Sequence, residues 1–303
     1  MLKITADFFS GIPNPEWIVD GDDAEAVLKD LAQHRAAVAS LDSGFQGLGN
    51  RGLIVEALSE HVSDEHGLPP IFKLANGGTR LESKGIEVAD RLISAMLKDG
   101  AGRHPAITNP ESITRGMHDF LKENIAISRP TIEVFPLSSS LTTITPEEII
   151  AQVQCAYEAT WFNPGFWNNP AHQSKNNCYN YATNRRTDTF AQPGRASGHM
   201  YSAINCHQVT NGAVSDGASI PCAPPNEAPR WFMALVIAPG PGFVDFHWYR
   251  KARQGFWGHK PGGTAARNYD NSGHIIYDPR TANRGPYTIF CGFMYAQRRM
   301  VVK

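Results

Sequence analysis

Turn residues divide the second half of this chain into short, evenly spaced segments, and this pattern constrains the fold more than any other feature. Three clusters rich in glycine, proline or asparagine occupy residues 239–242, 261–263 and 270–273. The apolar segments around them predict strands at residues 232–238, 244–249, 274–277 and 287–295. Short strands joined by such turns are typical of an antiparallel sheet.

The first half of the chain follows the periodicity of a small mixed α/β unit. Residues 3–9 predict a strand, and residues 53–58 predict a second strand or a short helix. An amphipathic helix is expected over residues 86–97, and another begins at the Asn-Pro-Glu sequence of residues 109–111. One helical face is marked by apolar residues at the spacing i, i+3, i+4 and i+7, namely Ala24, Val27, Leu28 and Leu31.

A change in composition divides the chain into two predicted domains. Residues 123–144 lose the helical period and contain a run of serine and threonine, which predicts a linker. Residues 145–148 then open a new helix with a capping box. The predicted organisation is an accessory α/β domain without an assigned role over residues 1–122 and a second domain over residues 145–303. We expect the second domain to fold without the first.

Charge and hydropathy argue against two classes of partner. The formal net charge of -1 gives no global basic field for a nucleic acid. No stretch approaches the roughly 18 uncharged apolar residues that a membrane span needs. The first residues have no apolar run behind a basic start, so we expect a protein that is cytoplasmic as synthesised. Export without a cleaved N-terminal signal stays open.

The five cysteines all lie in the second half of the chain, and their odd number leaves at least one thiol free or paired with another molecule. A reducing cytosol would keep all five as thiols. Cys206 and Cys222 bracket a turn-rich segment that a disulfide could close outside the cytosol, although two separate thiols are the favoured interpretation. Cys155 and Cys291 have the surroundings of core residues.

Cys178 is the candidate nucleophile. It follows a polar loop and begins a short predicted helix, where unsatisfied backbone N–H groups and the helix dipole favour a thiolate. Lys175 adds positive charge nearby. A lowered pKa of the thiol is what a cysteine nucleophile needs. The competing interpretation is a small buried residue.

His247 is the candidate base, and Asp278 is the residue that would orient it. Alternation along residues 244–250 places His247 on one face of a strand together with Asp245 and Tyr249. Asp278 ends the predicted strand at 274–277, so its carboxylate could accept a hydrogen bond from the imidazole if the two strands are neighbours. The alternative for Asp278 is a role in a turn or a cap. In that case Asp270 is the next candidate to orient His247.

Four further residues are candidates for oxyanion or substrate binding. The side-chain amide of Gln173 or Asn177 could stabilise an oxyanion together with the Cys178 backbone N–H. Either amide could equally bond its own backbone. His259 could replace His247 or line the cleft, and Trp248 belongs to the same substrate-binding group.

The order of these residues resembles the papain-like thiol hydrolases. A cysteine at the start of a helix is followed by a histidine on a strand and then by a polar residue on a later strand. The sequences Asn-Cys-Tyr-Asn-Tyr at 177–181 and Asp-Phe-His-Trp-Tyr at 245–249 carry the resemblance, which covers about residues 146–295. The layout is similar to the compact bacterial NlpC/P60 and CHAP types and to TecA-type effector deamidases, which use a Cys-His-Asp triad. The chain departs from NlpC/P60 in lacking small residues around the cysteine, and from papain by one position in the Gln-to-Cys spacing.

The resemblance implies an α+β fold, in which a small mixed α/β domain precedes a papain-like domain with a helix-borne cysteine packed on an antiparallel sheet. The implied activity is cysteine-dependent amide hydrolysis through a thioester, by a peptidase, peptidoglycan amidase or side-chain deamidase acting on a peptide, peptidoglycan or protein. No cofactor is expected. No metal is expected either, because the spacing of histidines and cysteines fits no zinc site. The alternative is a catalytically silent binding or effector-interaction module on the same fold, which needs no reactive thiol.

Overall fold

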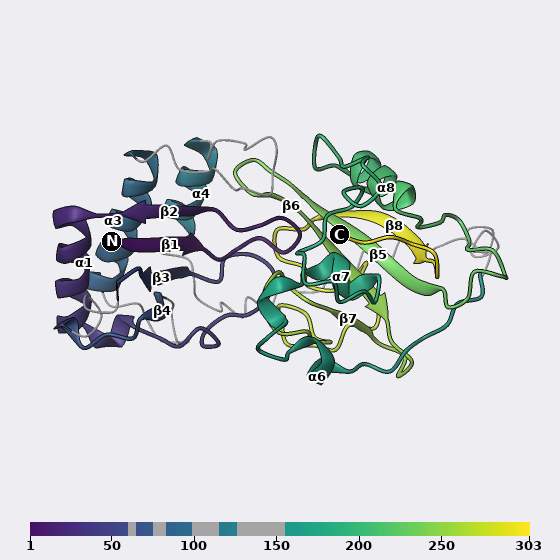
Figure 1. Ribbon diagram of the computed structural model, residues 1–303, viewed down its shortest axis with the longest axis horizontal. Helices are drawn as coiled ribbons and strands as arrows, with labels where there is room; N and C mark the ends of the chain where they lie inside the picture. The colour runs from purple at the N-terminus through teal and green to yellow at the C-terminus, as the bar shows by residue number, and fades with distance from the viewer. Residues whose placement is uncertain (60–64, 75–82, 99–114, 126–154) are drawn as a thin grey trace, which may run out of the picture.

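The computed structural model describes residues 1–59, 65–74, 83–98, 115–125 and 155–303 (Figure 1). The described residues form an α+β protein with two four-stranded antiparallel sheets. The predicted α+β class is therefore confirmed. The predicted linker at 123–144 lies outside the described residues except for residues 123–125, which end a helix. The helix predicted from residue 145 also lies outside them.

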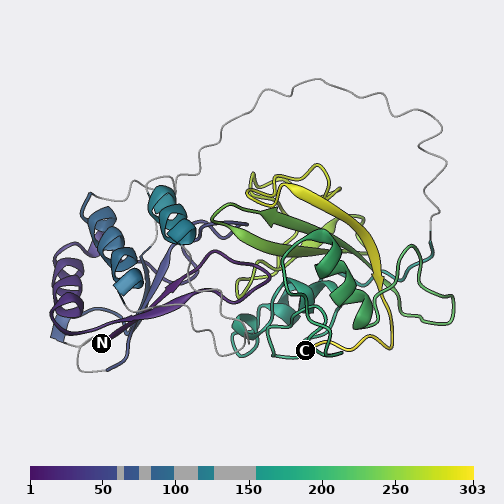
Figure 2. The ribbon, with the colours of Figure 1, turned by 90° about the horizontal axis from the view of Figure 1, so that it is seen from above.

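The N-terminal sheet has the strand order β2-β1-β3-β4. Its strands are β1 (Leu2–Ala6), β2 (Glu16–Val19), β3 (Leu53–Ala57) and β4 (Ile71–Leu74). One face of this sheet is covered by α1 (Gly21–Gln33), α3 (Ser83–Lys98) and α4 (Arg115–Ile125) (Figure 2). A 3-10 turn, η1 (Arg35–Ala37), follows α1. The apolar face predicted for α1 is confirmed, because its buried residues are Ala24, Val27, Leu28 and Leu31.

The C-terminal sheet has the strand order β7-β6-β5-β8. Its strands are β5 (Trp231–Pro239), β6 (Val244–Lys251), β7 (Trp257–His259) and β8 (Ile289–Ala296). The helices of this part are α6 (Pro164–Trp167), the 3-10 turn η2 (Gln173–Lys175), α7 (Cys178–Ala182) and α8 (Cys206–Ser215). α7 and α8 pack on one face of the sheet, in a cluster with Leu235, Ile237 and Trp248.

The other face of the C-terminal sheet shares one hydrophobic core with the N-terminal part. Val236 and Tyr249 belong to the same buried cluster as Leu2 and Val55 of the first sheet. The ring of Phe243 lies 5.6 Å from that of Phe8, 5.4 Å from that of Phe9 and 5.3 Å from that of Phe120, measured between centroids. Removing residues 1–122 would expose this face to water. The expectation that residues 145–303 fold alone is therefore at odds with the packing.

A buried ion network lies beside this shared core. The Arg51 guanidinium donates to Asp7 Oδ1 at 2.8 Å and to the carbonyl oxygen of Phe9 at 2.7 Å. Lys73 Nζ lies 3.6 Å from the other oxygen of Asp7. Asp7 thus neutralises cations in a region where unpaired charge would be costly.

The strand predictions succeed where the apolar run is long and fail where it is short. β5, β6 and β8 cover the segments predicted at 232–238, 244–249 and 287–295 to within two residues. β2, β4 and β7 have only three or four residues each, which is too short for an alternating apolar pattern to show in the sequence. In β4 the apolar run is also interrupted by the buried Lys73. The strand predicted at 274–277 is wrong, because that segment is a loop that forms an isolated bridge between Tyr269 and Ile275 and belongs to neither sheet.

Candidate functional site

The candidate site is centred on β6, whose residues alternate between two buried environments. Phe246 and Trp248 pack in the cluster beneath α7 and α8. The ring of His247 points to the opposite face, where its centroid lies 4.8 Å from that of Tyr249 and 5.7 Å from that of Tyr287. The predicted alternation along β6 is confirmed. Every residue from Asp245 to Arg250 is buried, so β6 is an internal strand on both faces.

α7 begins at Cys178, as the sequence predicts, because Asn177 caps it. The Asn177 side chain accepts from the backbone N–H groups of Tyr179 and Asn180, and the Asn180 side chain accepts from the Asn177 N–H. This reciprocal pattern is a capping box. The Asn177 amide also donates to the carbonyl oxygens of Gly11 and Ala191, each at 2.8 Å. Both of its N–H groups are therefore engaged, and Asn177 offers no donor to an oxyanion in this arrangement.

Cys178 is completely buried. Its exposed fraction is 0%, and its thiol donates to the carbonyl oxygen of Phe246 at 3.9 Å. Burial raises the pKa of the Cys178 thiol well above its usual range, and the Asp245 carboxylate adds to the rise. The expectation of a lowered pKa is therefore wrong for this conformation, because loss of water outweighs the N-terminus of a five-residue helix. Cys178 has the properties of a structural cysteine.

His247 bonds another histidine instead of the cysteine. Its Nε2 lies 2.9 Å from His259 Nδ1, and His259 Nε2 lies 3.0 Å from the carbonyl oxygen of Tyr269. Because that carbonyl can only accept, His259 Nε2 carries a proton. In the neutral ring His259 Nδ1 then accepts from His247 Nε2. His247 Nδ1 is left as an acceptor, and it is buried with no hydrogen-bond partner among the described residues.

Burial lowers the pKa of both histidines. The pKa of His247 falls well below its usual value, and the neighbouring His259 and Arg51 contribute to the fall. The pKa of His259 falls to about 3, with Arg267 as the second cause. Both rings are thus neutral at neutral pH, in agreement with the tautomers derived above.

The structure does not bring the predicted triad together. Cys178 and His247 face different sides of β6, and no hydrogen bond joins them among the described residues. Asp278 binds Arg280 Nη2 at 2.6 Å and accepts from the Arg280 backbone N–H, so it does not orient His247. The cause is the loop at 274–277, which leaves Asp278 outside the sheet. His259 is the predicted residue that does contact His247.

The remaining predicted residues have packing roles. The backbone carbonyl oxygen of Gln173 accepts from Lys260 Nζ at 2.6 Å. Lys260 also donates to the carbonyl oxygens of Asn176 and Gly262, and burial lowers the pKa of its ammonium to about 7. Trp248 is fully buried against Tyr179, with 5.5 Å between the ring centroids. Trp248 therefore lines no surface that a substrate could reach.

Asp245 is the polar residue of β6 whose role the sequence does not reveal. Its carboxylate accepts from the backbone N–H groups of Ser10, Gly11 and Ile12 at 2.5, 3.1 and 3.1 Å, and from the Tyr287 hydroxyl at 2.5 Å. Successive backbone N–H groups that converge in this way form an anion-binding nest. Burial raises the pKa of Asp245 to about 6, although these hydrogen bonds oppose the rise, so the group is mostly ionised at neutral pH. Asp245 thereby fastens the β1–β2 loop to the C-terminal sheet.

Two disulfides use four of the five cysteines. Cys155 pairs with Cys222 and Cys206 pairs with Cys291, with Cα–Cα distances of 5.5 and 5.2 Å. Cys178 is the free cysteine. The expectation of five thiols is wrong, and so is the candidate pairing of Cys206 with Cys222. Disulfides of this kind persist in oxidising compartments.

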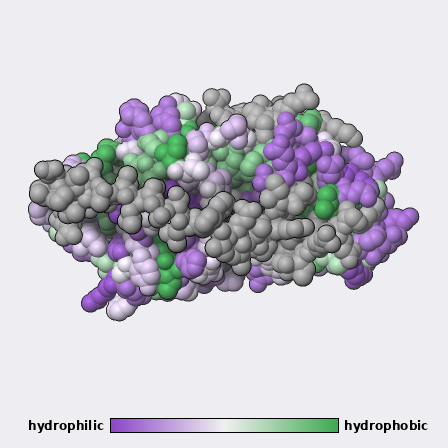
Figure 3. Space-filling model, turned by 180° about the vertical axis from the view of Figure 1, so that it is seen from behind, coloured by the Kyte–Doolittle hydropathy of each residue, from purple (hydrophilic) through white to green (hydrophobic). Residues whose placement is uncertain are grey.

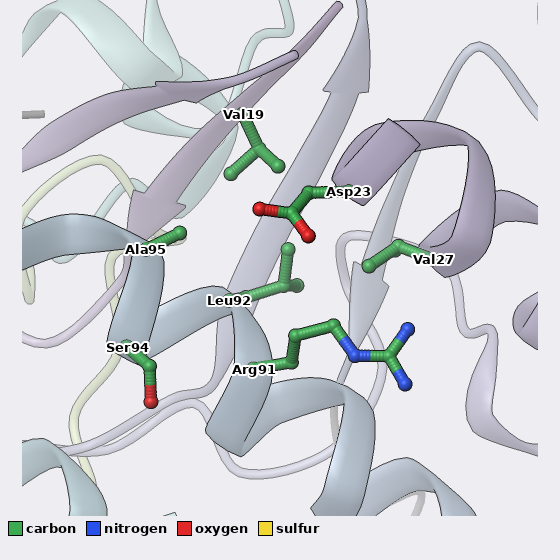
Figure 4. A pocket seen from close by; sticks show the side chains of 7 residues that line it. All are labelled: Val19, Asp23, Val27, Arg91, Leu92, Ser94 and Ala95. Carbon is green, nitrogen blue, oxygen red and sulfur yellow. The ribbon is translucent and has the colours of Figure 1, made fainter. Parts of the chain in front are cut away.

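A small surface pocket lies between α1, α3 and the end of β2 (Figure 4). Its lining is mostly apolar and includes Arg91. The Arg91 guanidinium is engaged by Asp30 at 3.2 Å and by Glu87 at 3.4 Å. None of the predicted site residues lines this pocket. The lining residues are Val19, Asp23, Val27, Arg91, Leu92, Ser94 and Ala95.

Within the described ranges, no helix has both the length and the apolar character of a membrane span. The same residues contain no group of three or more histidine, cysteine or carboxylate side chains arranged to hold a metal ion.

The buried ionisable groups predict that acid destabilises the fold. A histidine or lysine with a depressed folded pKa gives stability that is present above its unfolded pKa and lost as pH falls toward the folded value. For His259 that window runs from 6.5 down to about 3, and His247 shifts in the same direction. The stability contributed by Lys260 is lost as the pH falls from 10.5, the usual pKa of a lysine, to about 7, the folded pKa. Asp245 has the opposite effect, because its folded pKa is raised: its contribution to stability increases as the pH falls from about 6 to 3.8, its usual pKa.

We expect the free energy of unfolding to fall by a few kcal/mol between pH 8 and pH 5, at up to about 1.4 kcal/mol per pH unit for each net proton taken up on unfolding. Urea denaturation at each pH measures it. His259→Gln should flatten the slope below pH 6.5, whereas His199→Gln, at an exposed histidine, should leave it unchanged. A stability that is constant or rises toward pH 5 would contradict the neutral histidine pair.

The comparisons with known proteins give a relative of part of the chain. Insoluble matrix shell protein 1 of Ruditapes philippinarum is 48% identical over 136 residues, which are 45% of this chain and 89% of the relative. Neither a family model nor a solved structure matches the chain.

Proposed function

The chain belongs to the family of insoluble matrix shell protein 1, and from that premise we propose that it is a catalytically silent, structural binding component of an extracellular matrix. The observation that carries the proposal is the burial of Cys178, which is the free cysteine and has an exposed fraction of 0%. A matrix component has no need of a reactive thiol. The relative's name, which places that protein in an insoluble shell matrix, supports the choice of a matrix.

The two disulfides support an extracellular location. They join residues 67 and 85 positions apart, so each closes a long loop of the C-terminal part. Cross-links of this length restrict the unfolded chain and are retained where no cellular reductant removes them. On this proposal the chain is exported after synthesis.

Cysteine-dependent amide hydrolysis is the second candidate function. What favours it is the layout of a free cysteine at the first residue of α7, packed against the strand that carries His247. A papain-like arrangement of this helix and sheet remains part of that proposal, as does a peptide, peptidoglycan or protein substrate. Such an enzyme would need a movement of α7 that exposes Cys178 and a partner for the thiol other than the Phe246 carbonyl.

Thiol labelling distinguishes the two functions. We expect iodoacetamide to leave Cys178 of the folded, oxidised protein unmodified at pH 7 to 8, because both burial and a raised pKa suppress the thiolate. Denaturation should expose one labelled thiol per chain, found by intact mass. Ser174→Cys, at an exposed position four residues earlier, supplies a matched thiol that should be labelled at the rate of a free cysteine. Rapid, stoichiometric labelling of Cys178 in the folded protein would favour the hydrolase.

The matrix role has its own test, which is location. Antibodies against the chain should detect it in the washed, insoluble extracellular fraction of the organism that makes it, with reductant needed for full extraction. Recovery in the intracellular fraction alone, with four free thiols at the disulfide positions, would overturn the proposed role.

A further inference from the structure

Three cations beside the shared core are buried. Charged side chains usually lie at the surface, and Figure 3 shows hydrophilic side chains spread over the face seen from behind. Arg51, Lys73 and Arg267, however, have exposed fractions of only 2%, 0% and 7%. Asp7 pairs with Arg51 and Lys73, and the oxygens of Asp245 are taken by backbone N–H groups and a tyrosine hydroxyl. The buried cations of this region therefore exceed its buried carboxylates.

Arg267 is the cation that lacks a partner. Within the described ranges its side chain forms no hydrogen bond and no ion pair, and its buried Nε is unpartnered. The Tyr269 ring is its contact, at 5.3 Å from the guanidinium carbon to the ring centroid. Asp270, the nearest carboxylate along the chain, accepts from three backbone N–H groups instead. Lys260 is buried too, but three carbonyl oxygens accept from its ammonium. A buried cation without such partners is costly.

Backbone pairing places the Arg267 side chain on the side of the histidine pair. The N–H and carbonyl groups of Arg267 and His259 bond each other, both at 2.8 Å. Residues paired in this way direct their side chains to the same face of a sheet. Since the His259 ring bonds His247 Nε2 at 2.9 Å, Arg267 and His247 share that face.

Lys73 belongs to the same electrostatic cluster. Its Nζ is buried and forms no hydrogen bond among the described residues, although it lies 3.6 Å from Asp7 Oδ2. Burial lowers the pKa of Lys73, and the two arginines, Arg51 and Arg267, lower it further. Burial also lowers the pKa of His247, and the same two arginines add to that fall. Like charges have this effect only when they are close in a poorly hydrated region.

His247 adds a requirement that selects the kind of ligand. Its Nδ1 is an acceptor in the tautomer derived above, and it is buried without a partner among the described residues. A ligand that satisfies the whole cluster must accept from two cations and also donate one hydrogen bond. Water donates but brings no negative charge, chloride brings charge but no donor, and sulfate near neutral pH has acceptors alone. A small oxyanion that retains a proton meets both requirements.

We propose that this chain binds a small oxyanion carrying one proton, of the hydrogen phosphate or bicarbonate class, between Arg267, Lys73 and His247. The charged oxygens of the anion accept from the Arg267 guanidinium and the Lys73 ammonium, and its hydroxyl donates to His247 Nδ1. The anion thus offsets the excess of buried positive charge and links β4 of the N-terminal part to β6 of the C-terminal sheet. The site does not depend on the proposed matrix role, so its failure leaves that role to its own test of location.

Anion-dependent stability is the first test. The oxidised chain is unfolded in urea, dialysed to remove bound anions and refolded near neutral pH with chloride as the anion. We expect about 10 mM phosphate or bicarbonate to raise the Tm by at least about 3 °C over chloride at equal ionic strength. Sulfate should give less than about half of that rise, because it cannot donate to His247 Nδ1. The larger of the two expected responses identifies phosphate or bicarbonate as the ligand.

Arg267→Met is the second test. In chloride its Tm should be unchanged or higher, because the substitution removes a buried cation that lacks a partner. Its response to phosphate and bicarbonate should be lost. Arg253→Met, at an exposed arginine of the same part, should respond like the unmodified chain and so measures any general effect of the salts. Lys73→Met should also lose most of the response, and it provides a second variant if Arg267→Met does not fold.

Three results would overturn the inference. One is a Tm that phosphate and bicarbonate raise no more than chloride does. Another is an equal response to sulfate and phosphate, which would remove the need for a donor to His247. The third is a folded Arg267→Met or Lys73→Met protein that responds to phosphate and bicarbonate as fully as the unmodified chain.

Discussion

Replacing Asp245 by alanine is expected to lower the free energy of unfolding of the whole chain by about 3–5 kcal/mol. The substitution leaves the buried backbone N–H groups of Ser10 and Gly11, the partly buried N–H of Ile12 and the Tyr287 hydroxyl without their acceptor. Because the β1–β2 loop then loses its anchor on β6, the N-terminal part loses the surface on which it packs. Urea denaturation followed by both fluorescence and circular dichroism measures the change.

Asp278→Ala is the matched control for Asp245→Ala. Its carboxylate pairs with the exposed Arg280, so its loss should cost at most about 1 kcal/mol. Equal effects of the two substitutions would contradict an anchoring role for Asp245. So would an Asp245→Ala protein in which the two probes report separate transitions, because the shared core predicts one cooperative unit.

Gly11→Ala tests the same junction from the side of the loop. A Cβ at Gly11 would overlap the carbonyl oxygen and the ring of Phe246, which are a backbone group and a packed core side chain that cannot give way freely. We expect a loss of at least about 2 kcal/mol, by the mechanism of overpacking. Gly165→Ala is the control, since its nearest neighbour would lie at an ordinary contact distance of 3.7 Å.

Removing either disulfide should destabilise the folded chain by about 4 kcal/mol. The bonds span 67 and 85 residues, and closing loops of this length restricts the unfolded chain strongly. The double variants Cys155→Ser with Cys222→Ser, and Cys206→Ser with Cys291→Ser, measure each bond separately in denaturant melts. Peptide mapping without reductant should recover these two pairs and a single alkylatable cysteine, Cys178.

Cys178→Ser provides the control for the disulfide variants, because it removes a cysteine without removing a bond. It places a hydroxyl where the thiol donates to Phe246, so its effect should be smaller than that of either double variant. A fully reduced protein with the same denaturation midpoint as the oxidised one would contradict the pairing. Recovery of a Cys206–Cys222 peptide would contradict it as well.

The sequence by itself determines the local elements of this protein. The apolar spacing of Ala24, Val27, Leu28 and Leu31 defines the buried face of α1. Alternation along β6 correctly separates His247 from Phe246 and Trp248, because the strand period of two fixes which side chains share a face. The start of α7 at Cys178 follows from the capping residue before it. Each of these features depends on neighbours within a few residues.

Tertiary structure alone decides which elements meet, and it therefore decides the site. Asp245 binds N–H groups 233 to 235 positions earlier in the chain, and no local period encodes that contact. The same packing excludes water from Cys178. This loss of hydration affects the pKa of the Cys178 thiol more than the position at the start of a helix does. Whether Asp278 lies beside His247 depended on a strand at 274–277, and a short apolar run does not distinguish a strand from a loop. Cysteine pairing likewise follows from the distance between Cα atoms in the folded chain, which spacing along the sequence does not determine.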